Sequence, residues 1–110
     1  MDLQLTGKRA LVTGGSKGIG KAIARQLALE GVDLVISARH AGELAATAAE
    51  LAAETGRKVV GISADTSDDG SVKALIAATV AALGGLDILV NSAAKPGGAG
   101  AAAKAGAGYR

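Results

Sequence analysis

The residues best suited to chemistry form a glycine-rich stretch, VTGGSKGIG, at positions 12–20. Three of its glycines have the spacing GxxxGxG and follow a short apolar run. Gly14 permits a tight turn, Gly18 leaves room for an anion beside the backbone, and Gly20 lets a helix lie close to the preceding strand. The spacing therefore predicts a loop that binds phosphate groups at a helix N-terminus. The alternative is a tight turn in a chain that has 17 glycines.

A repeated strand–helix pattern predicts where this loop lies in the fold. Four short apolar segments predict buried strands, at residues 10–13, 32–37, 58–63 and 86–90. Three stretches between them have apolar residues at helical spacing, at residues 19–30, 43–54 and 68–83. Ser67 is the predicted N-cap of the third helix. The pattern predicts an α/β fold, a Rossmann-like doubly wound parallel sheet of about four strands in the order 3-2-1-4.

Four motifs, taken together, resemble the short-chain dehydrogenase/reductase family. TGGSKGIG at 13–20 is similar to the family's cofactor loop TGxxxGIG, and NSAA at 91–94 is similar to its NNAG, with Ser92 and Ala94 as departures. Arg39 in ISAR and Asp65 in ISADTS follow the second and third strands. The match covers roughly residues 5–96 and corresponds to only the first part of a typical member, so the fold is expected to be incomplete. The resemblance implies an oxidoreductase that transfers hydride between a nicotinamide cofactor and a carbonyl or alcohol.

The resemblance also implies which residues contact the dinucleotide. Ile19 would donate its backbone N–H, and Asp65 would accept a hydrogen bond from the adenine amino group. Asn91 would stabilise the central sheet, and Ala93 would lie along the cofactor. The implied cofactor-binding residues are Thr13, Gly14, Ser16, Lys17, Gly18, Ile19, Gly20, Arg39, Ala64, Asp65, Thr66, Asn91 and Ala93.

Charge distinguishes the two nicotinamide cofactors. NAD-binding sites usually have an acidic residue at the end of the second strand, where this chain has Ala38 followed by Arg39. A guanidinium binds a 2′-phosphate with two hydrogen bonds, and Lys17 in the glycine loop offers a second positive charge. The sequence therefore favours NADP(H) over NAD(H). The alternative is that both residues are ordinary solvated cations.

The family's chemistry needs a serine and a YxxxK motif that lie later in its chains. This sequence has one tyrosine, Tyr109, and no YxxxK. We therefore expect no catalytic residue here and no activity of this chain alone. Three interpretations stay open: a truncated or altered oxidoreductase, a non-catalytic nucleotide-binding or interaction module, and a fragment that binds nothing tightly.

Composition excludes several other classes of protein. The 110 residues are 49% hydrophobic and 1% aromatic, and the net charge is +2 with scattered Lys and Arg, which argues against nucleic-acid binding. The sequence has neither a signal peptide nor an apolar run of the roughly 18–20 residues that a membrane helix needs, so no membrane partner and a cytoplasmic location are expected. Without cysteines or a cluster of ligand-type residues, no metal site is expected.

The character of the sequence changes after Pro96. Residues 97–110 are nearly all Gly and Ala and have no periodic apolar face. Such side chains bury too little surface to offset the entropy of ordering. We expect a partial dinucleotide-binding domain over 1–96 and a disordered tail over 97–110. The strand at 86–90 would then form an open sheet edge through which the chain self-associates.

Overall fold

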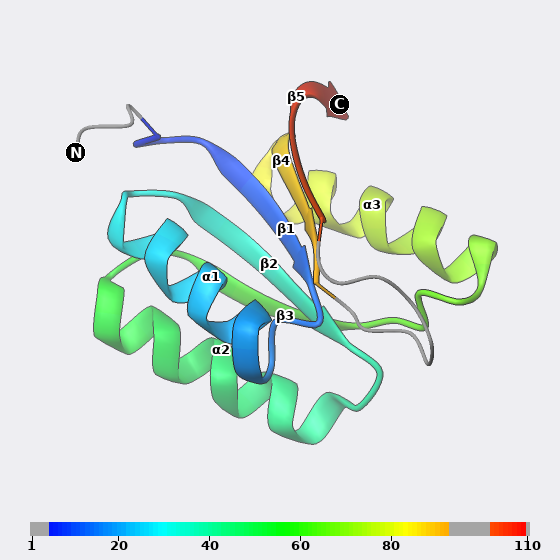
Figure 1. Ribbon diagram of the computed structural model, residues 1–110, viewed down its shortest axis with the longest axis horizontal. Coiled ribbons are helices and arrows are strands. Elements are labelled where there is room, and N and C mark those ends of the chain that lie inside the picture. The colour runs from blue at the N-terminus through cyan, green and yellow to red at the C-terminus, as the bar shows by residue number, and fades with distance from the viewer. Residues whose placement is uncertain (1–4, 93–101, 110) are drawn as a thin grey trace.

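The computed structural model describes residues 5–92 and, for the backbone only, residues 102–109. All four predicted strands and all three predicted helices are present, and one further strand follows them (Figure 1). In chain order the elements are β1 (Arg9–Thr13), α1 (Gly18–Leu29), β2 (Asp33–Ala38), α2 (Ala41–Thr55), β3 (Val59–Ser63), α3 (Asp69–Leu83), β4 (Leu86–Asn91) and β5 (Ala102–Tyr109).

The strands form one sheet in the order β3-β2-β1-β4-β5. The first four are parallel to one another, which confirms the predicted order 3-2-1-4. β1 lies at the centre, with Leu11 opposite Val35 of β2 on one side and Leu89 of β4 on the other. Because the four strands are parallel, their carboxyl ends all meet at one edge of the sheet.

The end of the chain differs from the sequence-based expectation. Residues 102–109, within the segment 97–110 for which a disordered tail was expected, pair with β4 as the antiparallel strand β5. Antiparallel pairing uses backbone groups, which Gly and Ala supply as well as any residue, so side-chain pattern gives no warning of it. β4 is therefore not an edge of the sheet, contrary to the expectation of an open edge there.

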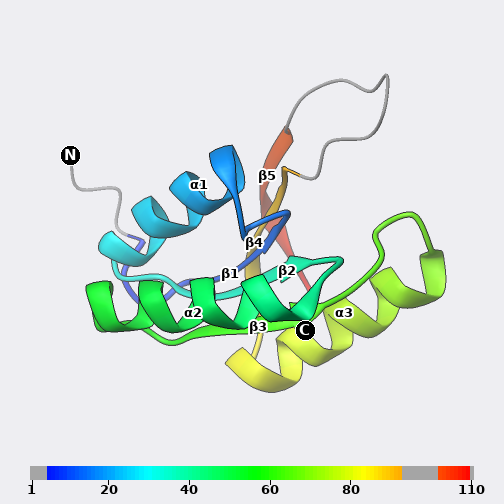
Figure 2. The same cartoon turned by 90° about the horizontal axis from the view of Figure 1, so that it is seen from below.

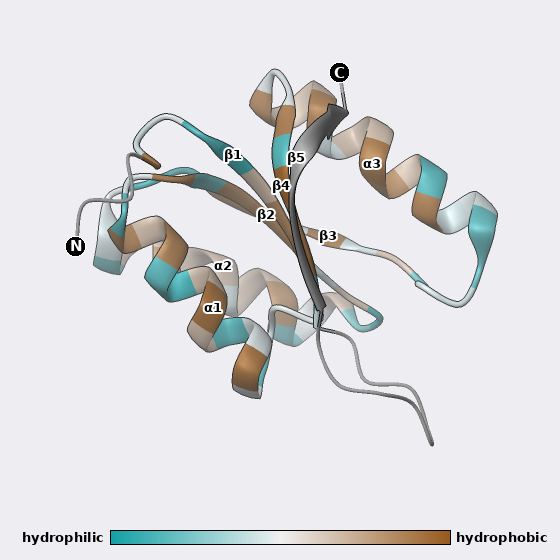
Figure 3. Cartoon of the chain, turned by 45° about the horizontal axis from the view of Figure 1, so that its top comes forward, coloured by the Kyte–Doolittle hydropathy of each residue, from teal (hydrophilic) through white to brown (hydrophobic). Residues whose placement is uncertain are grey.

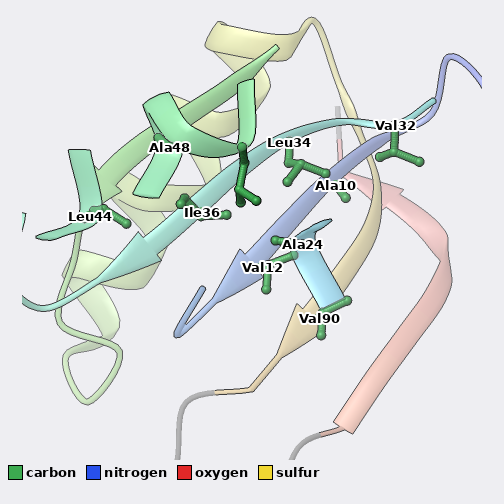
Figure 4. Close-up of a cluster of buried hydrophobic side chains, with 10 residues drawn as sticks. Ala10, Val12, Ala24, Val32, Leu34, Ile36, Leu44, Ala48 and Val90 are labelled. Carbon is green, nitrogen blue, oxygen red and sulfur yellow. The ribbon is translucent and has the colours of Figure 1, made fainter. Parts of the chain in front are cut away.

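Helices cover both faces of the sheet. α1 and α2 lie on one face and α3 lies on the other (Figures 1 and 2). The strand side chains alternate between two buried clusters, so that Leu34 and Ile36 pack toward α1 and α2 while Val35 packs toward α3. Figure 4 shows the first cluster, to which α1 contributes Ala24. In Figure 3 apolar residues run along β2, whereas the helices carry both apolar and hydrophilic residues.

One predicted helix cap is wrong by one residue. The N-cap of α3 is Asp68, whose side chain accepts a hydrogen bond from the N–H of Ser71 at 2.8 Å. Ser67 was predicted for this role, but its hydroxyl donates instead to the carboxylate of Asp65 at 2.6 Å. A carboxylate is the stronger acceptor for the helix N–H, and this leaves Ser67 to hold Asp65 in the candidate site.

Candidate cofactor-binding site

The candidate site lies at the carboxyl edge of the parallel strands. Thr13, Ala38, Ser63 and Asn91 end their strands on this edge. β1 is also the strand at which the order of the sheet reverses, because the chain runs from β1 toward β3 and then crosses back to β4. Open α/β sheets bind ligands at such a switch point.

The turn between β1 and α1 is fixed by backbone hydrogen bonds. The N–H groups of Gly14 and Gly15 both donate to the carbonyl oxygen of Ser37, at 2.7 and 3.1 Å. Gly14 and Gly18 have φ angles of 74° and 55°, in the left-handed region that favours glycine. The turn is thus tied to the end of β2, and Gly14 has the left-handed conformation of the tight turn predicted for it.

The first turn of α1 leaves backbone N–H groups without acceptors in the helix. The helix begins after Lys17, an extended N-cap residue whose side chain makes no capping hydrogen bond. Its first backbone bond runs from Lys21 N to Lys17 O at 3.2 Å, so the amides of residues 18–20 have no acceptor within the helix. This turn holds no acidic residue. Such a helix end attracts an anion.

Two glycines of the loop have opposite surroundings. A Cβ on Gly20 would overlap the carbonyl oxygen of Gly14 and lie 2.5 Å from Ser92 Oγ, so only glycine brings the helix this close to the strands. A Cβ on Gly18 would meet no protein atom within 4 Å, so the space beside that backbone is open. The loop therefore combines tight packing on its inner side with open space at the amides.

Hydrogen bonds join the ends of β1 and β4. The Thr13 hydroxyl lies 2.9 Å from the Asn91 side-chain oxygen and 3.3 Å from the Val90 carbonyl oxygen. The carbonyl of Thr13 accepts from the N–H of Ser92 at 3.2 Å and also from its hydroxyl. Asn91 is thus the last residue of β4 and lies next to Thr13 of the central strand. Ser92, which was not among the predicted site residues, contacts the end of β1 through both of its hydrogen bonds to Thr13.

Asp65 is held in place beside Arg39. Its Oδ1 accepts from the Ser67 hydroxyl at 2.6 Å, from the Ser67 N–H at 2.9 Å and from Arg39 Nη2 at 3.3 Å. The two Ser67 hydrogen bonds, with the Arg39 charge as a smaller cause, lower the pKa of the Asp65 carboxyl. The group is therefore ionised at neutral pH. Within the described part of the chain, no hydrogen bond uses its second oxygen, Oδ2, which is able to accept one from a ligand.

Lys17 and Arg39 are both exposed, on the loops that follow β1 and β2. Lys17 Nζ lies 3.4 Å from a carboxylate oxygen of Glu43 in the first turn of α2. The side chain of Lys17 is 74% exposed and that of Arg39 is 68% exposed. Glu43 has no motif that identifies it in the sequence. Its place beside the glycine loop follows only from how α2 packs against α1.

Four other predicted residues are Ser16, Ile19, Ala64 and Ala93. Ile19 is 70% exposed beside the loop, and the carbonyl of Ser16 accepts from the Thr47 hydroxyl at 3.4 Å. The N–H of Ala64 donates to the Ala38 carbonyl at 3.0 Å, which extends the pairing of β2 and β3. Ala93 lies outside the described residues.

A small cavity of about 200 Å³ opens on the α3 side of the same edge. It is lined by Leu11, Thr13, Thr66, Val72, Leu75, Ile76, Leu89 and Asn91. Three of these lining residues, Thr13, Thr66 and Asn91, are predicted site residues, and the others are apolar. The cavity is smaller than the roughly 300 Å³ of typical ligand pockets, so it does not enclose a dinucleotide.

The described residues contain neither a metal site nor a membrane-spanning helix. In residues 5–92 and 102–109 there is no group of three His, Cys, Asp or Glu side chains placed to hold a metal ion. None of the helices that the structure describes combines the length and the apolar character needed to cross a bilayer.

Comparisons with known proteins agree with this geometry. The family model for short chain dehydrogenase matches residues 8–106. Glucose 1-dehydrogenase 2 of Bacillus subtilis is 39% identical over 88 residues, which are 80% of this chain and 34% of the relative. L-Sorbose reductase from Gluconobacter frateurii, solved with NADPH and L-sorbose, superimposes with a TM-score of 0.81 at 35% identity, over 87% of this chain and 36% of that one.

A second solved structure is a short chain dehydrogenase from Burkholderia cenocepacia in complex with NADP. It has a TM-score of 0.72 at 46% identity, over 77% of this chain and 35% of that one. The chain thus spans about a third of the length of the proteins it matches. Because the family model matches most of these residues, the chain belongs to the short chain dehydrogenase family.

Proposed function

We propose that this chain is the NADP(H)-binding part of a short chain dehydrogenase. The observation that carries the proposal is the cation that follows β2. Arg39 stands on the binding edge, 3.3 Å from the carboxylate of Asp65, and the strand itself ends in Ala38 without an acidic residue. An acidic residue there would accept from the ribose hydroxyls of NAD(H) and would repel a 2′-phosphate. Similar structures solved with NADPH and with NADP support the same cofactor.

In this proposal each part of the site has a separate task. The free amides of residues 18–20 bind the pyrophosphate, and Asp65 Oδ2 accepts from the adenine amino group. Arg39 and Lys17 bind the 2′-phosphate through charge-assisted hydrogen bonds. The bound nicotinamide supplies the group that gives or takes a hydride. The residues of this chain contribute binding and orientation of the cofactor.

We further propose that these 110 residues bind the cofactor without turning over a carbonyl substrate. The family's proton exchange uses a tyrosine paired with a lysine in a YxxxK motif, which this sequence does not contain. A non-catalytic nucleotide-binding or interaction module is the alternative function. A purified chain that oxidises NADPH in the presence of carbonyl compounds would contradict the absence of turnover, and the binding proposal would stand.

Exchanging Arg39 for aspartate tests the cofactor assignment. Arg39→Asp removes a phosphate ligand and adds a like charge, so NADPH affinity should fall about tenfold or more, since charged hydrogen bonds contribute about 1.5–3 kcal/mol. NADH affinity should change little or rise. Both dissociation constants are measured by isothermal titration calorimetry.

The matched control is Lys8→Asp, the same charge reversal before β1 at the opposite edge of the sheet, where the lysine is exposed. It should leave both dissociation constants nearly unchanged. An unchanged NADPH affinity in Arg39→Asp, or an equal loss in Lys8→Asp, would overturn the assignment of Arg39.

A further inference from the structure

The two cations of the proposed phosphate site are each paired with a carboxylate. Lys17 Nζ lies 3.4 Å from Glu43, and Arg39 Nη2 lies 3.3 Å from Asp65. The two positive and two negative charges cancel. A 2′-phosphate that enters this site therefore meets no net positive charge until an ion pair opens.

The two carboxylates are held differently. Asp65 is held beside Arg39 by hydrogen bonds from the N–H and the hydroxyl of Ser67. Glu43 is 54% exposed, and within the described residues Lys17 is its one ion-pair partner. It stands in the first turn of α2, where the helix dipole stabilises a negative charge close to the glycine loop. Glu43 is thus the carboxylate that is able to turn away.

We infer that Glu43 competes with the cofactor's 2′-phosphate for Lys17 and so limits how strongly this site prefers NADP(H) over NAD(H). The inference rests on the function proposed above and adds a specificity-determining residue to it. When the phosphate binds, Lys17 must exchange one anion for another, and Glu43 must move into solvent or remain beside a like charge. NADH has no phosphate at this position, so its binding leaves the Lys17–Glu43 pair intact.

The inference predicts that neutralising Glu43 strengthens binding of one cofactor only. Glu43→Gln keeps the shape of the side chain and removes its charge. NADPH affinity should rise about two- to fivefold, in the range set by exposed ion pairs, while NADH affinity stays the same. The gain should shrink as salt rises from 50 to 500 mM, because exposed charges are screened. Dissociation constants for NADPH and NADH are measured by calorimetry at each salt concentration.

Glu54→Gln is the matched control, with the same change of charge at the other end of α2. Glu54 pairs with Arg25 at 2.6 Å, away from the glycine loop, so both affinities should be unchanged. Unaltered NADPH affinity in Glu43→Gln, or an equal gain in Glu54→Gln or for NADH, would overturn the inference and leave the proposed function intact. If the unaltered chain shows no saturable NADPH binding, the proposed function fails, and the inference fails with it.

Discussion

Replacing Gly20 with alanine tests whether the glycine loop depends on close packing between α1 and the ends of β1 and β4. The added Cβ would overlap the carbonyl oxygen of Gly14 and lie 2.5 Å from Ser92 Oγ. Gly14 is not free to move aside, because its N–H donates to the Ser37 carbonyl at 2.7 Å. Ser92 is held by its own hydrogen bonds to Thr13. The variant must therefore displace the start of α1 or break one of these bonds.

The expected loss of stability follows from three contributions. Overpacking by one methyl group destabilises by about 1–3 kcal/mol. A lost backbone hydrogen bond adds about 0.5–1.5 kcal/mol. Alanine offsets about 1 kcal/mol of this sum through its higher helix propensity. The net effect is a loss of about 0.5–3.5 kcal/mol, which lowers the melting temperature by roughly 4–8 °C per kcal/mol in a domain of this size.

Gly42→Ala is the control for helix propensity. Gly42 lies at the second position of α2, and a Cβ there would meet no atom within 4 Å. This variant should gain up to about 1 kcal/mol. Thermal unfolding of both variants is followed by circular dichroism, and NADPH binding is titrated on each. A Gly20→Ala variant as stable as Gly42→Ala would refute the packing argument. Normal NADPH affinity in a destabilised Gly20→Ala would refute only the link between this contact and the phosphate loop.

Two further predictions concern the core and acid stability. Leu34→Ala should destabilise the fold by about 2–5 kcal/mol in urea unfolding, because Leu34 of β2 is fully buried in the cluster under α1 and α2. Leu29→Ala, at a 58% exposed position, should change stability by less than about 0.5 kcal/mol. Equal effects of the two substitutions would contradict the assigned core. Hydrogen bonds from Arg9, at 2.9 Å from Nε to Oδ2, lower the pKa of the Asp87 carboxyl in the folded state. The contribution of Asp87 to folding stability is therefore complete at pH values above its pKa in the unfolded chain, near 3.9. It is lost as the pH falls through the lowered pKa of the folded state. The stability difference between the unaltered chain and Asp87→Asn should be constant above about pH 5 and shrink below pH 4, and a difference unchanged down to pH 2.5 would contradict this role.

The sequence predicts the sheet and the glycine loop because both depend on local rules. Each strand is a short apolar run that ends where a turn begins, and the order 3-2-1-4 follows from the short connections and their right-handed crossovers. The left-handed φ angles of Gly14 and Gly18 are a backbone requirement that the residue type itself reveals. These features need no knowledge of which side chains meet across the fold.

Backbone pairing at the end of the chain follows no such rule. Nothing in the Gly/Ala pattern of residues 102–109 distinguishes a strand from an irregular segment, because pairing with β4 uses N–H and C=O groups that every such sequence has. Ser67 and Asp68 show a similar limit. Both are good capping residues, and the choice between them depends on Asp65, whose carboxylate binds Ser67 across the turn.

The electrostatics of the site show most clearly what sequence motifs leave out. Counting cations near the glycine loop gives Lys17 and Arg39 and hence a preference for a phosphorylated cofactor. The folded chain places a carboxylate beside each of these cations. Glu43 of α2 lies 3.4 Å from Lys17, and Asp65, which follows β3, lies 3.3 Å from Arg39. In the proposed function, the binding strength would depend on the difference between two ion pairs, one with the protein and one with the phosphate. The cations in the motif favour a phosphorylated cofactor, and we propose that the carboxylates beside them set how strong that preference is.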